Sequence, residues 1–467
     1  MTATAQSGLA AHPDVASNIA LMEVWLKARL AYDKGSPGVA VAIVHDQEVV
    51  YAGGFGLADV ESKTPVTADS IFRIASHSKL FTAIAVMQLR DQGKLSLDDP
   101  ITRYLPWFQI QSDFADAPPI TIRHLLTHTS GLPREAGSAY WQEFNSPTAD
   151  EVRERLPGQR AALPTETRWK YSNLALGLAG EIVTAVSGQP YEQYVQQHIL
   201  DPLKMTSTSA VFPDAHRKQL VTGYTRKLPG KAREPLPFVD AVGLAAATGF
   251  SSTVTDMARF IAWQFRLRES GGEEVLKAST LREMQRVHWL QPDWKSGWGI
   301  GFSITHTADR DLIGHGGGYP GYLTNTRISP QEKVGVVVFT NSLDGEPQVI
   351  SDRIFEWVAK PLARAAAGKA GTEPDPTWKN YEGTYRNLWS DAHVLPLDGK
   401  LAMITPTVDN PKADYFTLEP VSEHEFRLEG SGSAALAEPV IFELGPDGIA
   451  TRVKVGDNWS ERVSYET

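Results

Sequence analysis

The sequence predicts an α/β fold in the broad sense: an antiparallel sheet flanked by helices, an all-helical region, and then a small all-β domain. Strand-like runs occur near the N-terminus and again over residues 297–342, whereas residues 120–290 are typical of helices and long loops. The strand–helix alternation of a parallel sheet is missing, so we expect one antiparallel sheet built from both ends. Turn-forming residues over 365–377 indicate a linker between domains of residues 1–364 and 378–467.

The N-terminal part is expected to hold a helix, a hairpin and a second helix. Apolar residues recur at helical spacing over residues 18–33. Two apolar runs, residues 38–44 and 49–56, are separated by a polar break and predict a β-hairpin. Residues 71–92 are typical of a turn that leads into a helix, and Gly93 marks the end of that helix.

A helix start and a second group of strands are expected further along the chain. Thr253 followed by Asp256 predicts a capping box that opens a helix. The later elements expected are strands over residues 297–304, 322–329 and 333–341 and a helix over residues 350–363. After the linker, short strand-like runs separated by turns predict an all-β module.

Composition and charge exclude several classes of protein. The 467 residues include 55 acidic and 45 basic ones, and this net charge of -10 argues against nucleic acid or an anionic membrane as partner. The lack of cysteine excludes disulfides, zinc thiolate sites and cysteine nucleophiles. No signal-peptide pattern and no membrane-length apolar run are seen, so we expect a cytoplasmic protein, or a periplasmic or secreted one if a leader was removed. The expected partner is a small-molecule or peptide substrate, and a homo-oligomer is left open.

Ser76 is the first candidate for chemistry, because it stands three residues before Lys79 where a helix is expected to start. Residues at this spacing share a helix face, and the helix N-terminus offers a free N–H beside the serine. A serine hydroxyl becomes a nucleophile when a neighbour removes its proton, and a lysine of lowered pKa can do so. The alternative is a helix N-cap serine with a surface lysine. The spacing occurs only once in the chain, which favours the catalytic pair.

Tyr171 and Asn173 form the second candidate pair. A phenol near a lysine ammonium loses its proton more easily and can relay it between nucleophile and leaving group. The Asn173 amide can bind a substrate carbonyl or hold the lysine. The alternative is a tyrosine at the edge of the core with a satisfied hydroxyl. The same spacing recurs from Tyr385 to Asn387 in the all-β module, where we expect no chemistry.

The third candidate is the run from His315 to Gly318 in the strand-rich segment. Gly316 and Gly317 would let a substrate backbone lie against a strand edge. The backbone N–H of Gly318 could complete an oxyanion hole with that of Ser76. The alternative is a plain glycine turn.

Other motifs are absent or rejected. Residues 316–321 match a dinucleotide-binding spacing, but the strand-then-helix context is missing and Pro320 interrupts it. No G-x-S-x-G elbow, H-E-x-x-H or P-loop occurs. His124 and His128 are the only histidine pair worth checking for a metal, and a structural role is favoured for both. We therefore expect no metal and no cofactor.

In this order, the three elements resemble the serine β-lactamase and penicillin-binding-protein superfamily. Tyr171 and Asn173 as the second motif point to its class C branch, which also holds D-aminopeptidases and related esterases. Residues 124–132 resemble the family's loop between the first two motifs, and residues 249–260 resemble the segment before the third. The resemblance therefore covers roughly residues 35–345. The C-terminal module resembles the lipocalin-like β-barrel that is attached to some of these enzymes.

The resemblance implies a role for each candidate. Ser76 would attack a carbonyl and form an acyl-enzyme. Lys79 and Tyr171 would share the base role, and Tyr171 would then protonate the leaving group. Asn173 would orient the substrate and Lys79. The N–H groups of Ser76 and Gly318 would hold the oxyanion.

Two departures from the family pattern bear on the substrate. Where many relatives have a lysine that helps hold a carboxylate, this chain has His315, as in D-aminopeptidase-like and esterase-like relatives. A histidine is mostly neutral at pH 7, so we predict poor β-lactamase activity and better hydrolysis of ester, amide or D-peptide bonds. Glu166 stands where relatives often have glycine.

Several alternatives stay open at this point. They are a β-lactamase or D-Ala-D-Ala carboxypeptidase, an acyltransferase and, least favoured, a non-catalytic sensor that keeps the fold. The C-terminal module is expected to shape the active-site entrance or to mediate oligomers, given its size and its place after a short linker.

Overall fold

The computed structural model describes residues 8–430 and 436–465. Its centre is a sheet of nine strands in the order β3-β2-β1-β13-β12-β11-β10-β9-β8, and the paired neighbours are antiparallel. The strands are β1 (Gly38–His45), β2 (Glu48–Asp59), β3 (Thr64–Pro65), β8 (Trp289–Leu290), β9 (Ser296–Trp298), β10 (Ser303–His306), β11 (Asp311–Tyr319), β12 (Tyr322–Ser329) and β13 (Val334–Thr340). Because β1 pairs with β13, both ends of this region meet in one sheet, as predicted.

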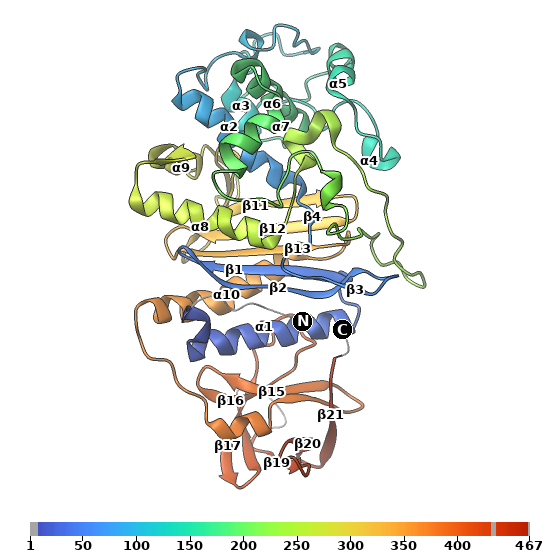
Figure 1. The fold of residues 1–467 in the computed structure, drawn as a ribbon, viewed down its shortest axis with the longest axis vertical. Helices are drawn as coiled ribbons and strands as arrows, with labels where there is room; N and C mark the ends of the chain where they lie inside the picture. Colours follow the sequence, from blue (N-terminus) through green and yellow to red (C-terminus); the bar gives the residue numbers. More distant parts are fainter. Residues whose placement is uncertain (1–7, 431–435, 466–467) are drawn as a thin grey trace.

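Helices cover both faces of the sheet (Figure 1). One face carries α8 and, beyond it, the helical region, while α1 and α10 lie on the other face. The helices are α1 (Pro13–Ala31), α2 (Ser78–Asp91), α3 (Ile122–Leu126), α4 (Tyr140–Glu143), α5 (Ala149–Arg155), α6 (Asn173–Ser187), α7 (Tyr191–Val195), α8 (Val254–Ser270), α9 (Ala278–Met284) and α10 (Pro347–Ala366). Strands β1 and β13 are buried almost throughout because they are covered on both sides. Two short ribbons, β4 (Phe72–Arg73) with β5 (Ser251–Ser252) and β6 (Glu273–Glu274) with β7 (Leu276–Lys277), complete this region.

Residues 297–304 were expected to form one strand, but the structure divides them between two strands, β9 and β10. Strands β9 and β10 are antiparallel neighbours joined by a tight turn that contains Gly301. Gly301 has φ +79°, and a Cβ atom there would lie 2.6 Å from Ala83 Cβ. Glycine therefore lets the turn pack directly against α2, and a straight strand would not make this contact.

The capping box predicted at α8 is only half formed. Thr253 Oγ1 accepts from the N–H of Asp256 at 3.1 Å, as an N-cap should. The Asp256 carboxylate does not return to the N-cap backbone; it accepts from Ser207 N at 2.8 Å and Thr208 Oγ1 at 2.9 Å. The buried carboxylate thus ties the preceding loop to the start of the helix.

The C-terminal module is a closed barrel of eight antiparallel strands. Its strands are β14 (Gly383–Arg386), β15 (Asp391–Leu397), β16 (Lys400–Ile404), β17 (Phe416–Ser422), β18 (Glu425–Glu429), β19 (Pro439–Leu444), β20 (Ala450–Val455) and β21 (Asn458–Val463). Apolar side chains such as Tyr385, Met403 and Phe442 form a core cluster of the barrel. Before the barrel, α10 runs to Ala366, so the first two residues of the expected linker are helical. The division at residues 365–377 stays a prediction.

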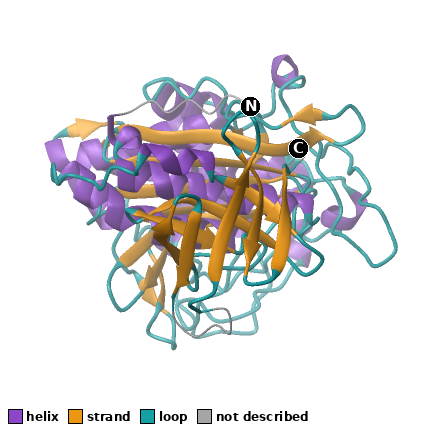
Figure 2. Cartoon of the chain, turned by 90° about the horizontal axis from the view of Figure 1, so that it is seen from below, coloured by secondary structure: helices purple, strands orange, loops and turns teal. Residues whose placement is uncertain are grey.

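The barrel contacts the helices on the far side of the sheet (Figure 1; Figure 2 shows the same end of the molecule from below). The indole N–H of Trp25 donates to Val408 O at 3.0 Å, and that of Trp357 donates to Asn410 Oδ1 at 3.2 Å. Within one chain, α1, α10 and the sheet therefore separate the barrel from the helical region. Among the described residues, no helix has the length and apolar character that crossing a membrane requires.

Candidate active site

Ser76 lies in a single 3₁₀ turn, Ala75–His77, directly before α2. Ala75 has a left-handed φ of +51°, a conformation that is strained for a residue other than glycine and is often found at functional sites. The buried His77 ring fastens the turn: Nδ1 is 3.1 Å from Ile74 O and Nε2 is 2.8 Å from Thr326 Oγ1 on β12. Because a carbonyl only accepts, Nδ1 carries the proton and Nε2 accepts from the threonine.

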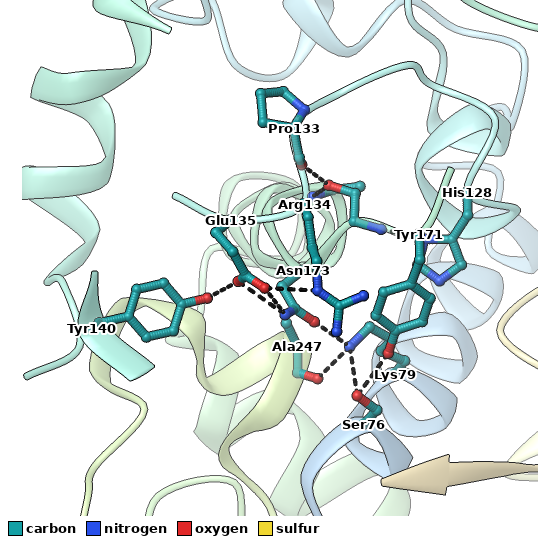
Figure 3. Close-up of polar contacts among 12 residues, drawn as sticks. Ser76, Lys79, His128, Pro133, Arg134, Glu135, Tyr140, Tyr171, Asn173 and Ala247 are labelled. Atoms are coloured by element: carbon teal, nitrogen blue, oxygen red, sulfur yellow. Dashed lines mark hydrogen bonds and ion pairs between the residues drawn. The ribbon is translucent and has the colours of Figure 1, made fainter. Parts of the chain in front are cut away.

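The three residues predicted to do the chemistry lie together (Figure 3). Tyr171 Oη donates to Ser76 Oγ at 2.6 Å, and Lys79 Nζ is 3.1 Å from the same oxygen. Lys79 Nζ also donates to Asn173 Oδ1 and to Ala247 O, both at 2.8 Å. The nucleophile candidate thus touches both of its expected proton-handling partners.

Burial shifts the pKa values of these partners in opposite directions. It lowers the pKa of the fully buried Lys79 well below its usual value, although the Glu135 carboxylate opposes the shift. It raises the pKa of Tyr171, although the hydrogen bond to Ser76 opposes that. The environment therefore favours a neutral amine at Lys79 and a protonated phenol at Tyr171.

A carboxylate that the sequence did not single out fixes the orientation of Asn173. The Asn173 amide nitrogen donates to Glu135 Oε1 at 3.1 Å and Oε2 at 3.0 Å (Figure 3). Tyr140 Oη and Arg134 Nε donate to the same carboxylate. Because Glu135 only accepts, the amide must turn its oxygen toward Lys79.

Strand β11 lines the cavity at Ser76. Its pairing with β10 ends where Ser303 faces Gly314, while its pairing with β12 continues to Tyr319. Among the described strands, nothing pairs with the other edge of β11 from His315 onward. The predicted residues His315, Gly316, Gly317 and Gly318 line a cavity of about 640 Å³ together with Ser76, Tyr171 and Asn173.

Gly317 has a packing role that its neighbours lack. A Cβ atom there would lie 2.5 Å from Ile74 O and 3.1 Å from Ala75 Cβ. At Gly316 and Gly318 the nearest contacts of such an atom would be 3.4 Å and 3.5 Å. Glycine at 317 thus lets the turn that carries Ser76 lie directly on β11.

His315 is a neutral imidazole with one unused nitrogen. Burial, followed by the charges of His77 and Lys79, lowers the pKa of His315 well below its usual value. Its Nδ1 lies 2.5 Å from Gly316 O and must carry the proton. Nε2 is therefore a bare acceptor, and it is buried without a hydrogen-bond partner among the described residues.

Three tryptophan side chains that no motif indicated complete the cavity. Trp141, Trp169 and Trp298 line it, and the His128 ring lies 4.4 Å from that of Tyr171 and 5.0 Å from that of Trp298. They come from separate segments, so their meeting depends on the tertiary fold. Of the three tryptophans, only Trp169, two residues before Tyr171, stood close to a recognised motif.

The structure gives plain roles to the remaining singled-out residues. His124 closes a capping box with Thr121, and His128 Nδ1 accepts from Ser172 N at 3.2 Å. Glu166 has φ +62°, which explains why glycine suits this position, and its carboxylate lies 3.7 Å from His124 Nε2. Tyr385 is buried in the barrel core. Within the described residues, no cluster of three or more His, Asp or Glu side chains could hold a metal.

The fold and this constellation define a β-lactamase-like serine hydrolase architecture. Residues 19–359 match the family described as Beta-lactamase, and the chain belongs to that family. It is thus a member of the serine β-lactamase and penicillin-binding-protein superfamily, with a barrel domain at its C-terminal end.

Three known proteins illustrate the relationship. "Beta-lactamase-like protein 2" of Dictyostelium discoideum is 28% identical over 350 residues, covering 73% of this chain and 62% of that protein. "Esterase EstB" of Burkholderia gladioli is 34% identical over 228 residues, covering 46% and 58%. The matched region thus spans less than two thirds of either protein. A structure of the octameric penicillin-binding protein homologue from Pyrococcus abyssi superimposes with a TM-score of 0.63 at 25% identity, covering 95% of this chain and 99% of that one.

Proposed function

We propose that the protein is a serine hydrolase that cleaves ester, amide or D-amino-acid peptide bonds through an acyl-enzyme at Ser76. The observation that carries the proposal is the pair of contacts at Ser76 Oγ, 2.6 Å from Tyr171 Oη and 3.1 Å from Lys79 Nζ. Such contacts are the arrangement that an activated serine needs. All three side chains are present, which disfavours the sensor.

Lys79 is the better candidate for the acylation base. A neutral amine has two N–H bonds, and these suit the two shorter contacts, with Asn173 Oδ1 and Ala247 O. Its lone pair then faces Ser76 Oγ and can take the hydroxyl proton. The lowered pKa of Lys79 supports this protonation state.

Tyr171 then acts as the proton donor to the leaving group. As Ser76 Oγ bonds to the substrate carbonyl carbon, the N–H groups of Ser76 and Gly318 hold the oxyanion. When the carbon–leaving-group bond breaks, the Tyr171 hydroxyl gives its proton to the leaving group and regains one from Lys79. Water then attacks the acyl-enzyme, which releases the carboxylic acid and returns the proton to Ser76.

The neutral His315 favours esterase or amidase activity over lactamase activity. A substrate carboxylate would meet a bare imidazole nitrogen instead of an ammonium. The similarity to an esterase points the same way. A β-lactamase or D-Ala-D-Ala carboxypeptidase, or acyl transfer to an amine or alcohol, is the alternative.

Steady-state kinetics with p-nitrophenyl acetate, p-nitrophenyl butyrate and a chromogenic β-lactam test the proposal. We expect turnover of the esters that Ser76→Ala abolishes, with far slower turnover of the β-lactam. Faster β-lactam hydrolysis, or a stable β-lactam adduct, would favour the penicillin-binding alternative. An ester product that forms only with an added alcohol or amine would identify an acyltransferase.

We also propose a homo-oligomer, because the octameric homologue aligns over nearly the whole chain. The exposed side chains of Leu388 and Trp389, at the β14–β15 turn of the barrel, offer an apolar contact surface. Size-exclusion chromatography coupled to light scattering should report a mass of two or more chains, each of 51.2 kDa. A monomer at micromolar concentration would contradict the proposal.

A further inference from the structure

Arg134 presents a cation to the Ser76 cavity that the proposed chemistry does not use. Its side chain lines the cavity and is 62% exposed. The guanidinium carbon lies 5.1 Å from the centre of the Tyr171 ring (Figure 3). Within the guanidinium, only Nε has a hydrogen-bond partner among the described residues, Glu135 Oε1 at 3.0 Å. The two terminal amino groups are therefore left to bind a ligand.

The fold holds this guanidinium in place. Arg134 O accepts from the N–H of Asn173 at 2.7 Å, which ties the loop to the start of α6. Glu135 binds Nε, and the guanidinium lies against the Tyr171 ring as a cation–π contact. A side chain that is already ordered loses little further freedom when it binds a ligand.

The neighbouring carboxylate does not cancel this cation for a ligand. Among the described residues that line the cavity, Glu135 is the other charged one, and its side chain is only 25% exposed. The side chains of Asn173 and Tyr140 also donate to its oxygens. Because these hydrogen bonds offset its charge, Glu135 opposes an anion at the exposed end of Arg134 only weakly.

Arg134 lies on the leaving-group side of the reaction centre. Tyr171 is the proposed proton donor to the leaving group, so that group must approach Tyr171, and Arg134 lies over the ring of the same tyrosine. Beside β11 a carboxylate would find no cation, because burial keeps His315 neutral. The inference rests on the proposed function and adds the charge of the leaving group.

The exposed end of a guanidinium suits a carboxylate better than a neutral group. Its terminal amino groups form a planar fork, from which a carboxylate accepts two parallel hydrogen bonds. A carboxamide of the same shape has one acceptor oxygen and no charge, so it loses one of these bonds and the ionic attraction.

We propose that Arg134 binds a carboxylate on the leaving group of the substrate, so that the enzyme favours leaving groups that carry a free carboxylate over neutral ones of the same shape.

The test uses two aryl acetates, which release 3-hydroxybenzoate or 3-hydroxybenzamide. The two leaving groups have the same shape, and only the first carries a carboxylate. The ratio of kcat/KM for the charged ester to that for the neutral ester is measured in wild type and in Arg134→Gln, so that the intrinsic reactivity of each ester cancels. We expect the variant to lower this ratio about fivefold, as for a well-oriented but partly exposed ion pair. An unchanged ratio would overturn the inference.

Two further variants connect the preference to the position of the charge. Arg134→Lys keeps the charge but loses the fork, so its ratio should lie between those of wild type and Arg134→Gln. Arg168→Gln is the matched control, because Arg168 is exposed and stands directly before Trp169 but is not among the residues that line the cavity. Its ratio should stay at the wild-type value. An equal fall in Arg168→Gln would show that the general surface charge, and not Arg134, causes the preference.

A second pair of esters tests the assignment to the leaving group. Phenyl hydrogen adipate and phenyl adipamate place a carboxylate and a carboxamide on the acyl side instead. We expect Arg134→Gln to leave the ratio for this pair unchanged. A fall as large as that for the leaving-group pair would contradict the assignment.

A separate readout distinguishes failure of this inference from failure of the proposed function. Turnover of phenyl acetate, whose leaving group carries no carboxylate, reports the Ser76 chemistry alone. Wild-type turnover of this ester together with an unchanged ratio would reject only the role of Arg134. The Arg134 charge also helps to lower the pKa of Lys79, but that effect acts on charged and neutral esters alike and cancels in the ratio. Thermal unfolding of each variant shows that a changed ratio belongs to a folded protein.

Discussion

Gly317→Ala perturbs the contact through which β11 supports the Ser76 turn. A Cβ atom at position 317 would lie 2.5 Å from Ile74 O and 2.3 Å from Thr324 Oγ1. The threonine hydroxyl can rotate away, but Ile74 O belongs to the backbone two residues before the nucleophile. Reaching an ordinary C···O distance of about 3.3 Å requires the strand and the turn to separate by about 0.8 Å.

Such a separation should impair both activity and stability. It displaces Ser76 Oγ from Tyr171 Oη, which lies 2.6 Å away. A misplacement near 1 Å can lower a rate by about 10²-fold, so we expect kcat/KM for a p-nitrophenyl ester to fall by about that factor. Overpacking of this kind costs about 1–3 kcal/mol, so the free energy of unfolding in urea should drop by about that amount.

Gly318→Ala is the matched control for stability. Its Cβ atom would meet Leu323 Cδ2 at 3.5 Å, an ordinary contact, and no left-handed φ is involved. We expect its free energy of unfolding to stay within about 0.5 kcal/mol of wild type. Wild-type activity and stability in Gly317→Ala would show that the close approach of β11 to the turn is not what positions Ser76.

Three further predictions concern proton transfer at the site. Because burial lowers the pKa of Lys79, kcat/KM should rise with pH as the amine loses its proton. The rise should level off well below pH ~10.4, the ordinary pKa of lysine. A profile that is still rising at that pH would contradict the assignment of Lys79 as the base. Glu135→Gln removes the charge that raises the pKa of Lys79, so the acid limb of that profile should move to lower pH, and an unmoved limb would argue against this coupling. Tyr171→Phe should lower kcat/KM by about 10²- to 10⁴-fold while the free energy of unfolding in urea changes by no more than about 1.5 kcal/mol, and a near wild-type rate would remove Tyr171 from the mechanism.

Local patterns predicted the main elements of this fold because each depends on nearby residues. Two apolar runs separated by a polar break indicated the hairpin of β1 and β2, and helical spacing after Ser76 indicated α2. Residues 297–304 are an exception: their apolar pattern is that of a strand, but the chain turns at Gly301, where it packs closely against Ala83. That approach is a tertiary contact with no trace in the local pattern.

The candidate site divides in the same way. Ser76, Lys79, Tyr171 and Asn173 stand in recognisable spacings, and the structure brings them within hydrogen-bonding distance of one another. Glu135 stands in no such spacing, because its role depends on facing an amide that is 38 residues further along the chain. The tryptophans that line the cavity could not be predicted from the sequence either, because an isolated tryptophan is typical of any protein core.

The position of the barrel could not be predicted from the sequence either. A role at the active-site entrance or in oligomers was expected from its size and its place after a linker. In the structure it contacts α1 and α10, on the far side of the sheet from the helical region (Figure 1). Complementary surfaces, and not the linker, determine the face on which a domain docks. Here Trp25 and Trp357 contact the loop that holds Val408 and Asn410.

Intact-protein mass spectrometry after incubation with an activated alkyl phosphonate tests the central claim, that Ser76 is the nucleophile. The phosphonate phosphorus accepts the serine oxygen and expels its leaving group, so each reactive serine gains one phosphonyl group. We predict one adduct per chain in the wild-type protein and none in Ser76→Ala. A wild-type protein that stays unmodified, or an adduct that persists in Ser76→Ala, would contradict the account.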